Sequence, residues 1–220
     1  MSFVVALLGA ESTGKTTLSR ELAAALRAEG RQVALVPEYL REFCEQHGRT
    51  PLQHEQQGIA DEQTRRIAVA AATHEFVIAD TTALMIAVYS DLVFGDTALY
   101  AGAEAAHRAG CDLTLLSALD LPWLADGLQR DGPHVREPVD ALVRASLARV
   151  GIEHAVVFGR DEARLQAALA SVQRALAPPD AAEAAGNARW HWHCERCGDA
   201  DCERRPQLPQ AAHRSENDKR

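Results

Sequence analysis

The chain has 220 residues, of which 47% are hydrophobic and 25% charged, and its formal net charge is −8. This length and apolar content fit one compact domain with a short appendage, which excludes wholesale disorder. The chain has no long run of Lys and Arg, so we do not expect sequence-independent binding of nucleic acid. It has no apolar segment near the roughly 20 residues that span a bilayer, so we do not expect a membrane protein.

Short apolar runs alternate with long amphipathic stretches along the chain, which is typical of a parallel sheet covered by helices. The apolar runs predict strands at 3–8, 33–36, 76–79, 113–116 and 155–158. Helices are predicted at 15–29, 38–47, 52–75 and 161–176, with two more between residue 82 and the fourth strand that break at 94–96. The predicted fold class is therefore α/β, in three layers, with a central parallel five-stranded sheet and helices on both faces.

Two segments do not fit this alternation. Residues 120–138 are rich in Pro, Gly and charge, and we expect them to form an active-site lid loop. Pro178-Pro179 begins an Ala-rich stretch, after which the composition shifts to His, Cys and charge. We therefore predict a domain at 1–177, a linker at 178–188 and a short Cys/His tail at 189–220.

Residues 9–16 read Gly-Ala-Glu-Ser-Thr-Gly-Lys-Thr and match the phosphate-binding loop, or Walker A motif. Glycines let such a loop curl so that its N–H groups face phosphate oxygens, and the following helix adds its positive end. Lys15 would reach the β- and γ-phosphates, and the Thr16 hydroxyl would ligate Mg²⁺. A chance match in a turn would lack the predicted strand before it and the helix after it. The sequence predicts an ATP site made of Gly9, Ala10, Glu11, Ser12, Thr13, Gly14, Lys15, Thr16 and Thr17.

Two carboxylates follow predicted strands, at the sheet edge where ligands bind in such folds. Glu38 follows the second strand, where it can accept the proton of an attacking hydroxyl. Asp80 ends the third strand, where it can hold Mg²⁺ or contact a substrate hydroxyl. The alternatives are a helix first-turn carboxylate for Glu38 and a plain helix N-cap for Asp80.

Further substrate contacts are predicted around these carboxylates. Arg41 lies one helical turn after Glu38 and can orient it or bind an anionic group, although it could equally be a solvated arginine. Trp123 follows the fourth strand and can stack on a planar, cationic ring, or simply pack under the loop. The predicted substrate site consists of Glu38, Tyr39, Arg41, Asp80, Asp120 and Trp123.

Arg130 and Arg136 flank Gly132-Pro133 in the irregular segment. Arginines on a mobile loop can close over the γ-phosphate and neutralise charge in the transition state. Solvated loop arginines are the alternative. The predicted catalytic set consists of Lys15, Glu38, Arg130 and Arg136.

Four pieces of the sequence resemble the nicotinamide riboside kinase domain of NadR-type proteins, part of a wider group of AAA-like P-loop kinases. They are GAESTGKTTL, PEYLRE, ADTTALMIAVYSDLVFG and LDLPWLADGLQRDGP, in the family's order and within residues 3–176. One departure is Thr82, where the resemblance leads us to expect an acidic residue. The phosphate loop is shared by many proteins, whereas the third and fourth pieces are much more specific.

The resemblance implies transfer of the ATP γ-phosphate to the 5′-hydroxyl of nicotinamide riboside, which gives nicotinamide mononucleotide for NAD biosynthesis. It implies ATP and Mg²⁺ as cofactors and a small nucleoside as partner. Because the matching pieces begin at the first strand, we expect neither the adenylyltransferase nor the DNA-binding activity that some family members carry. A kinase for another nucleoside or small alcohol, and a regulatory ATPase without acceptor, stay open. The N-terminus lacks the basic region of a signal peptide, so we expect a cytoplasmic location.

Three of the five cysteines crowd into the tail, in the stretch WHWHCERCGDADC. The spacing Cys-x₂-Cys lets two thiolates bind one ion, and a histidine could complete a tetrahedral set. A reduced tail without metal is the alternative. The predicted ligands of a structural Zn²⁺ are Cys194, Cys197, Cys202 and either His191 or His193.

Overall fold

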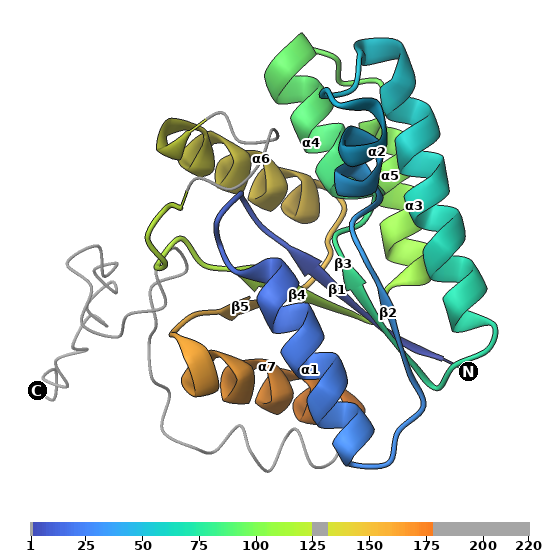
Figure 1. The fold of residues 1–220 in the computed structure, drawn as a ribbon, viewed down its shortest axis with the longest axis vertical. Coiled ribbons are helices and arrows are strands. Elements are labelled where there is room, and N and C mark those ends of the chain that lie inside the picture. The colour runs from blue at the N-terminus through green and yellow to red at the C-terminus, as the bar shows by residue number, and fades with distance from the viewer. Residues whose placement is uncertain (1, 125–131, 178–220) are drawn as a thin grey trace, which may run out of the picture.

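The computed structural model describes residues 2–124 and 132–177. Its centre is one sheet of five parallel strands, as predicted, and the strands lie in the order β2-β3-β1-β4-β5 (Figure 1). The predicted linker and Cys/His tail lie outside the described residues. The strands are β1 (Phe3–Leu8), β2 (Val33–Val36), β3 (Phe76–Asp80), β4 (Leu113–Ser117) and β5 (Ala155–Val157).

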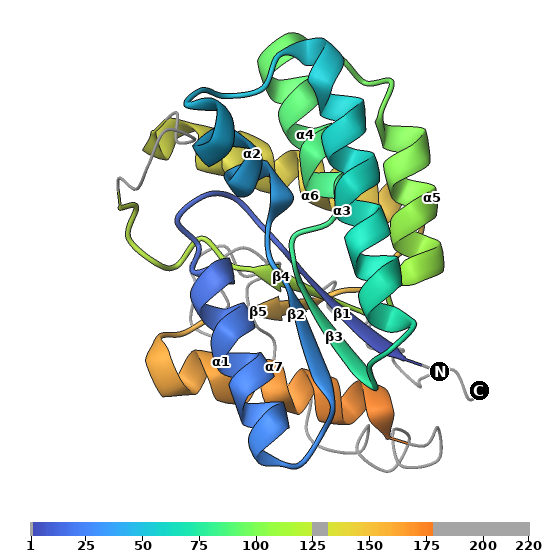
Figure 2. The same ribbon diagram turned by 45° about the vertical axis from the view of Figure 1, so that its right-hand side comes forward.

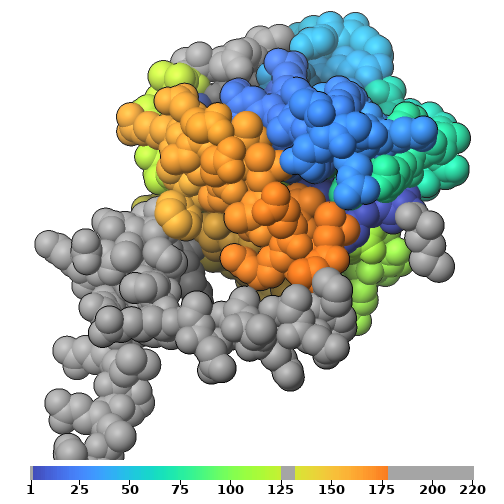
Figure 3. Space-filling model, turned by 90° about the horizontal axis from the view of Figure 1, so that it is seen from below, coloured from blue at the N-terminus to red at the C-terminus, as the bar shows by residue number. Residues whose placement is uncertain are grey.

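Helices cover both faces of the sheet, so the fold has the three predicted layers. Figure 2 shows α1 and α7 on one face and the other helices on the opposite face, and Figure 3 shows α1 (blue) and α7 (orange) side by side. The helices are α1 (Lys15–Ala28), α2 (Tyr39–His47), α3 (Gln56–Ala71), α4 (Ala83–Phe94), α5 (Tyr100–Gly110), α6 (Arg136–Arg149) and α7 (Asp161–Leu176), with short 3₁₀ turns η1 (Gln53–Glu55) and η2 (Pro133–Val135).

The apolar strand β1 shows why the sheet needs cover on both faces. Its side chains alternate in direction, so that Val5 and Leu7 pack in the core under α1 and α7, while Val4 and Leu8 join the clusters on the other face. The helix α4 is apolar all round, with residues 83–88 buried. It packs against α3, α5 and α6 and forms the centre of the second layer.

Two predicted segments, one helix and one loop, were wrong in detail. The helix expected at 52–75 is divided into η1 and α3, and the Glu55 carboxylate caps the start of η1 by accepting the backbone N–H of Leu52 over 2.7 Å. The segment 120–138, expected to be a loop throughout, ends in η2 and the first turn of α6. Pro138 is tolerated there because the N–H groups of a first helical turn have no intrahelical partner.

The register between β1 and β3 matters for the site. Leu7 pairs with Asp80, so the loop that follows β1 begins beside the end of β3. Within residues 2–124 and 132–177, no helix is long and apolar enough to cross a membrane.

Candidate active site

A cavity of about 670 Å³ opens between the phosphate loop, α2 and the end of α4. One wall is the loop and the start of α1, and the other lining residues come from α2, the segment 50–52, the start of α3 and α4. Its lining residues are Glu11, Ser12, Thr13, Gly14, Lys15, Thr16, Thr17, Arg20, Glu38, Leu40, Arg41, Cys44, Glu45, Thr50, Pro51, Leu52, Gln56, Tyr89, Val93 and Phe94.

The two glycines of the phosphate loop meet different constraints. Gly9 has φ +138°, and a Cβ there would lie 3.1 Å from the side chain and carbonyl of Ser117. Gly14 has φ +75°, and a Cβ there would lie 2.9 Å from a methyl carbon of Leu121. Both conformations disfavour residues with a side chain. The loop therefore curls as the motif predicts, and the Lys15 ammonium donates to the Ala10 carbonyl over 2.8 Å.

The hydroxyl of Thr16 donates to Oδ2 of Asp80 over 2.6 Å. Asp80 is only 2% exposed, and its other oxygen, Oδ1, has no hydrogen-bond partner among the described residues. A buried carboxylate oxygen without a donor is costly, and carboxylate and hydroxyl oxygens are the ligands that Mg²⁺ prefers. These two residues therefore fit a Mg²⁺ ion. In the described ranges no group of three or more His, Cys, Asp or Glu could hold a metal, so phosphate and water would supply the other ligands.

Thr82, rather than Asp80, is the N-cap of α4. Its hydroxyl accepts the backbone N–H of Leu84 over 3.3 Å and lies 3.0 Å from Nδ1 of His107, whose Nε2 lies 2.8 Å from the Thr114 hydroxyl. This hydroxyl is buried and outside the cavity lining. The residue that stands where an acidic side chain is expected thus belongs to the core.

Glu38 and Arg41 both line the cavity, as their predicted roles require. Glu38 occupies the N-cap position of α2 and its side chain is 13% exposed. Nη2 of Arg41 lies 3.7 Å from a Glu38 carboxylate oxygen, so the two side chains form an ion pair one turn apart. Tyr39 is not part of the cavity lining, because its ring faces the Arg66 guanidinium at 4.3 Å.

Asp120 and Trp123 also lie outside the cavity lining. The Asp120 carboxylate accepts the backbone N–H of Gly159 over 2.6 Å and pairs with the Arg164 guanidinium at 3.1 Å. Arg164 is buried and also donates to the Thr13 carbonyl over 2.7 Å. Asp120, which was predicted to bind substrate, therefore contacts the phosphate loop indirectly, through Arg164.

Of the two predicted lid arginines, Arg130 lies outside the described residues. Arg136 is the first residue of α6 rather than part of an irregular loop, and it is 8% exposed. Its Nη1 donates to the Leu121 carbonyl over 2.9 Å, while Nε and Nη2 have no hydrogen-bond partner among residues 2–124 and 132–177. Burial lowers the pKa of Arg136, and the carboxylates of Asp120 and Glu11 act in the opposite direction. Arg136 is not among the lining residues of the cavity, but Nε and Nη2 can still donate to an anion.

The predicted zinc ligands Cys194, Cys197, Cys202, His191 and His193 lie outside the described residues, and that site stays a prediction. Several lining residues were not singled out from the sequence. Four of them follow a helical spacing of four from another cavity residue: Arg20 from Thr16, Cys44 from Leu40, Glu45 from Arg41 and Val93 from Tyr89. The others carried no comparable signal; they include Thr50, Gln56 and Phe94.

Comparison with known families gives one match. The model of a family described as "AAA domain" matches residues 4–164, which is more than half of the chain. None of the curated proteins compared with the chain matches it.

Solved structures with the same fold include two of a NadR protein. One, a complex with NAD and AMP-PNP, has 21% identity and a TM-score of 0.63 over 78% of this chain and 49% of that chain. Another, a complex with NR, has 21% identity and a TM-score of 0.66 over 80% of this chain and 51% of that one. The chain thus spans about half the length of these NadR chains.

A third solved structure is the thymidylate kinase of Ehrlichia chaffeensis. It has 15% identity and a TM-score of 0.55, over 78% of this chain and 97% of that chain. Together with the NadR structures, this similarity shows that the chain has the fold of P-loop kinases.

Proposed function

The chain belongs to the AAA domain family, and we propose that it is a kinase that transfers the γ-phosphate of ATP to the 5′-hydroxyl of nicotinamide riboside. The observation that carries the proposal is that the phosphate loop and the Glu38 carboxylate line one cavity. A nucleotide-dependent switch needs a phosphate loop, but it needs no adjoining space with a carboxylate for an acceptor.

The proposed reaction is an in-line displacement at the γ-phosphorus. The acceptor oxygen forms a bond to phosphorus while the bond to the β,γ-bridging oxygen breaks, so that ADP leaves. Glu38 takes the hydroxyl proton, and Lys15 compensates charge on the transferring group. When bound at Thr16 and Asp80, Mg²⁺ would neutralise charge on the β- and γ-phosphates. Arg136 and Arg130 stay candidates for the same task.

Part of the cavity lining supports an acceptor with a flat, positively charged ring. Pro51, Leu52, Val93 and Phe94 provide apolar surface there, and Glu45 adds a negative charge to the lining. The nicotinamide ring of the riboside is planar and cationic, so it suits both features. The NadR structure in complex with NR supports the same acceptor by analogy of fold.

A panel of acceptors tests the proposal. ADP release from Mg-ATP is measured with nicotinamide riboside, the common nucleosides, nucleoside monophosphates and no acceptor, using Lys15→Ala as the inactive control. We expect nicotinamide riboside to accelerate ADP release most. Stronger acceleration by another compound would identify that compound as the acceptor instead of nicotinamide riboside. Equal ADP release without any acceptor would favour a regulatory ATPase.

A further inference from the structure

A single side chain joins the two loops that carry Glu38 and Asp80. Gln63 lies in the middle of α3, is 1% exposed and does not line the cavity. Its Oε1 accepts the backbone N–H of Tyr39 over 2.7 Å. Its Nε2 lies 3.4 Å from the Pro37 carbonyl and 3.3 Å from the Thr81 carbonyl, and donates to both.

These partners fix the orientation of the amide. A backbone N–H can only donate, so the atom facing Tyr39 must be the oxygen. The nitrogen then faces two carbonyls, which can only accept. All the contacts are therefore complementary, and turning the amide over would oppose like groups at each of them.

The hydrogen-bond partners of Gln63 are sequence neighbours of Glu38 and Asp80. Pro37 and Tyr39 flank Glu38 on both sides, and Thr81 follows Asp80 directly. Thr81 also has φ +74°, an unfavourable conformation for a residue with a side chain. The Gln63 amide thus spans the ends of β2 and β3 and holds a strained residue next to the predicted magnesium ligand.

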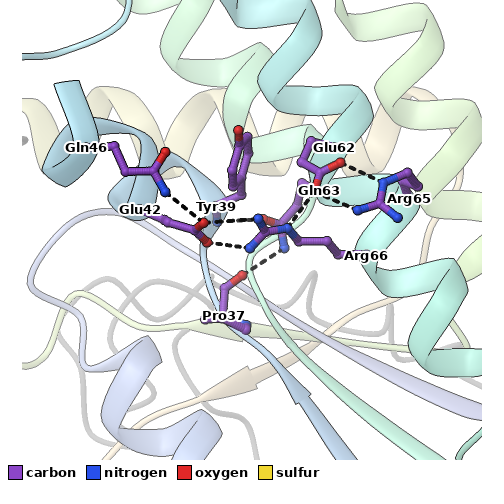
Figure 4. Close-up of polar contacts among 8 residues, drawn as sticks. All are labelled: Pro37, Tyr39, Glu42, Gln46, Glu62, Gln63, Arg65 and Arg66. Atoms are coloured by element: carbon purple, nitrogen blue, oxygen red, sulfur yellow. Dashed lines mark hydrogen bonds and ion pairs between the residues drawn. The ribbon is translucent and has the colours of Figure 1, made fainter.

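The next turn of α3 secures the same part of α2 (Figure 4). The Arg66 guanidinium lies over the Tyr39 ring and donates to the Glu42 carboxylate over 2.5 and 3.2 Å. Its Nε donates to Glu62 over 2.7 Å. These contacts hold the first turn of α2 on α3 but do not reach the end of β3, whereas the Gln63 amide donates to a carbonyl in each of the two loops.

We propose that Gln63 is a positioning residue that fixes the proton acceptor Glu38 relative to the magnesium ligand Asp80, by tying their two loops to one amide. The proposal rests on the proposed function for what the two carboxylates do. The expected effect of Gln63 is on catalysis rather than on nucleotide binding, because its hydrogen bonds within the described residues go to Pro37, Tyr39 and Thr81 and not to the phosphate loop. Misplacing a reacting group by about 1 Å can cost on the order of 10²-fold in rate.

The test compares Gln63→Met with Gln57→Met in the full chain. Methionine keeps the length of the side chain and removes its hydrogen bonds, and Gln57 is an exposed glutamine on the same helix, bonded only to Asp61 among the described residues. We expect Gln63→Met to lower kcat at saturating substrates about tenfold or more. Affinity for a non-hydrolysable ATP analogue should stay within about twofold, and Gln57→Met should match the wild type.

A double-mutant cycle separates positioning from a structural role. If Gln63 acts through Glu38, its substitution should lower kcat by less than about twofold in a Glu38→Gln background, since residues that act as a unit are not additive. A full, multiplicative loss in that background, or a wild-type kcat in a folded Gln63→Met protein, would overturn the proposal.

Hydrogen exchange tests the same contacts without any substrate. In Gln63→Met, the amides of residues 38–42 and 80–83 should both exchange faster than in the wild type, whereas Gln57→Met should change neither. Unchanged exchange in both segments would refute the inference even if the chain transferred phosphate to no acceptor. A wild type inactive with every acceptor, but with the expected exchange, would count against the proposed function alone.

A second variant covers the case in which Gln63→Met does not fold. Gln63→Glu keeps an oxygen towards Tyr39, and burial raises the pKa of a carboxyl group, so the protonated form can still donate. The ratio of its kcat to that of the wild type should be higher at about pH 5.5 than at about pH 8. A ratio that does not change with pH would contradict the donor role.

Discussion

The Thr16 hydroxyl and the Asp80 carboxylate are joined by a hydrogen bond of 2.6 Å, which ties the start of α1 to the end of β3. The parallel register that pairs Leu7 with Asp80 brings these residues together. The second Asp80 oxygen has no hydrogen-bond partner within the described ranges, so it remains available as a ligand for a cation.

Asp80→Asn should raise the Mg²⁺ concentration needed for half-maximal activity about tenfold or more. The substitution keeps the shape and an acceptor for Thr16, but it removes the charge. Activity measured as a function of free Mg²⁺ gives the result, with the exposed Asp61→Asn as the matched control. An unaltered Mg²⁺ dependence would mean that Asp80 does not hold the ion.

Glu38→Gln should lower kcat about 10²-fold or more, the usual scale of acid–base assistance, with little change in affinity for an ATP analogue. Glu45→Gln, in the same cavity, should mainly raise KM for the acceptor, because its charge acts equally on the bound and transition states. Steady-state kinetics of both variants provide the comparison. If the Glu38→Gln protein turns over at the wild-type rate, Asp80 rather than Glu38 would be the residue that accepts the hydroxyl proton.

Gly14→Ala should weaken ATP-analogue binding and destabilise the fold by at least about 1 kcal/mol. The new Cβ would meet a Leu121 methyl carbon at 2.9 Å in a backbone conformation with φ +75°. Gly58→Ala is the control: it lies in α3 with open space around it, and should stabilise the helix by up to about 1 kcal/mol. Denaturant unfolding and titration with the analogue measure both effects. Equal behaviour of the two variants would contradict the loop geometry.

Arg136→Ala should slow turnover more than it weakens ATP binding, since charge compensation acts mainly in the transition state. The loss of one such donor costs on the order of 10²-fold in kcat. Arg149→Ala, at the exposed end of the same helix, should leave turnover unchanged. Reduced ATP affinity with wild-type turnover at saturation would argue against this role. Because Arg136 is buried, unfolding curves must accompany the kinetics.

Stability should fall in acid partly because of His107. Burial lowers its pKa to about 4 from an ordinary 6.5, so the unfolded chain binds a proton more readily than the native one. Its contribution is therefore complete above about pH 6.5 and is lost towards pH 4, by roughly 3 kcal/mol in total. His107→Gln should show a shallower loss of unfolding free energy over this range. Parallel curves for both proteins would show that His107 does not titrate there.

The sequence predicted the strands and the phosphate loop because both depend on local patterns, namely apolar runs and glycine spacing. It did not predict the roles of residues whose partners are far along the chain. Arg164 reads as a solvated residue of an amphipathic helix, yet it reaches the carbonyl of Thr13, 151 positions away. Similarly, Gln63 lies in a polar stretch of α3, and only the packed fold reveals that its partners flank two predicted site residues.

Transfer of labelled phosphate tests the central claim most directly. The full chain is incubated with Mg²⁺, nicotinamide riboside and ATP labelled at the γ-phosphate, and the products are identified by mass spectrometry, with Lys15→Ala as the control. The account predicts label in nicotinamide mononucleotide at the 5′ position in the wild type, and loss of the transfer in a folded Lys15→Ala protein, whose barrier rises by on the order of 3 kcal/mol or more. Label found only in inorganic phosphate, or equal transfer by Lys15→Ala, would contradict it.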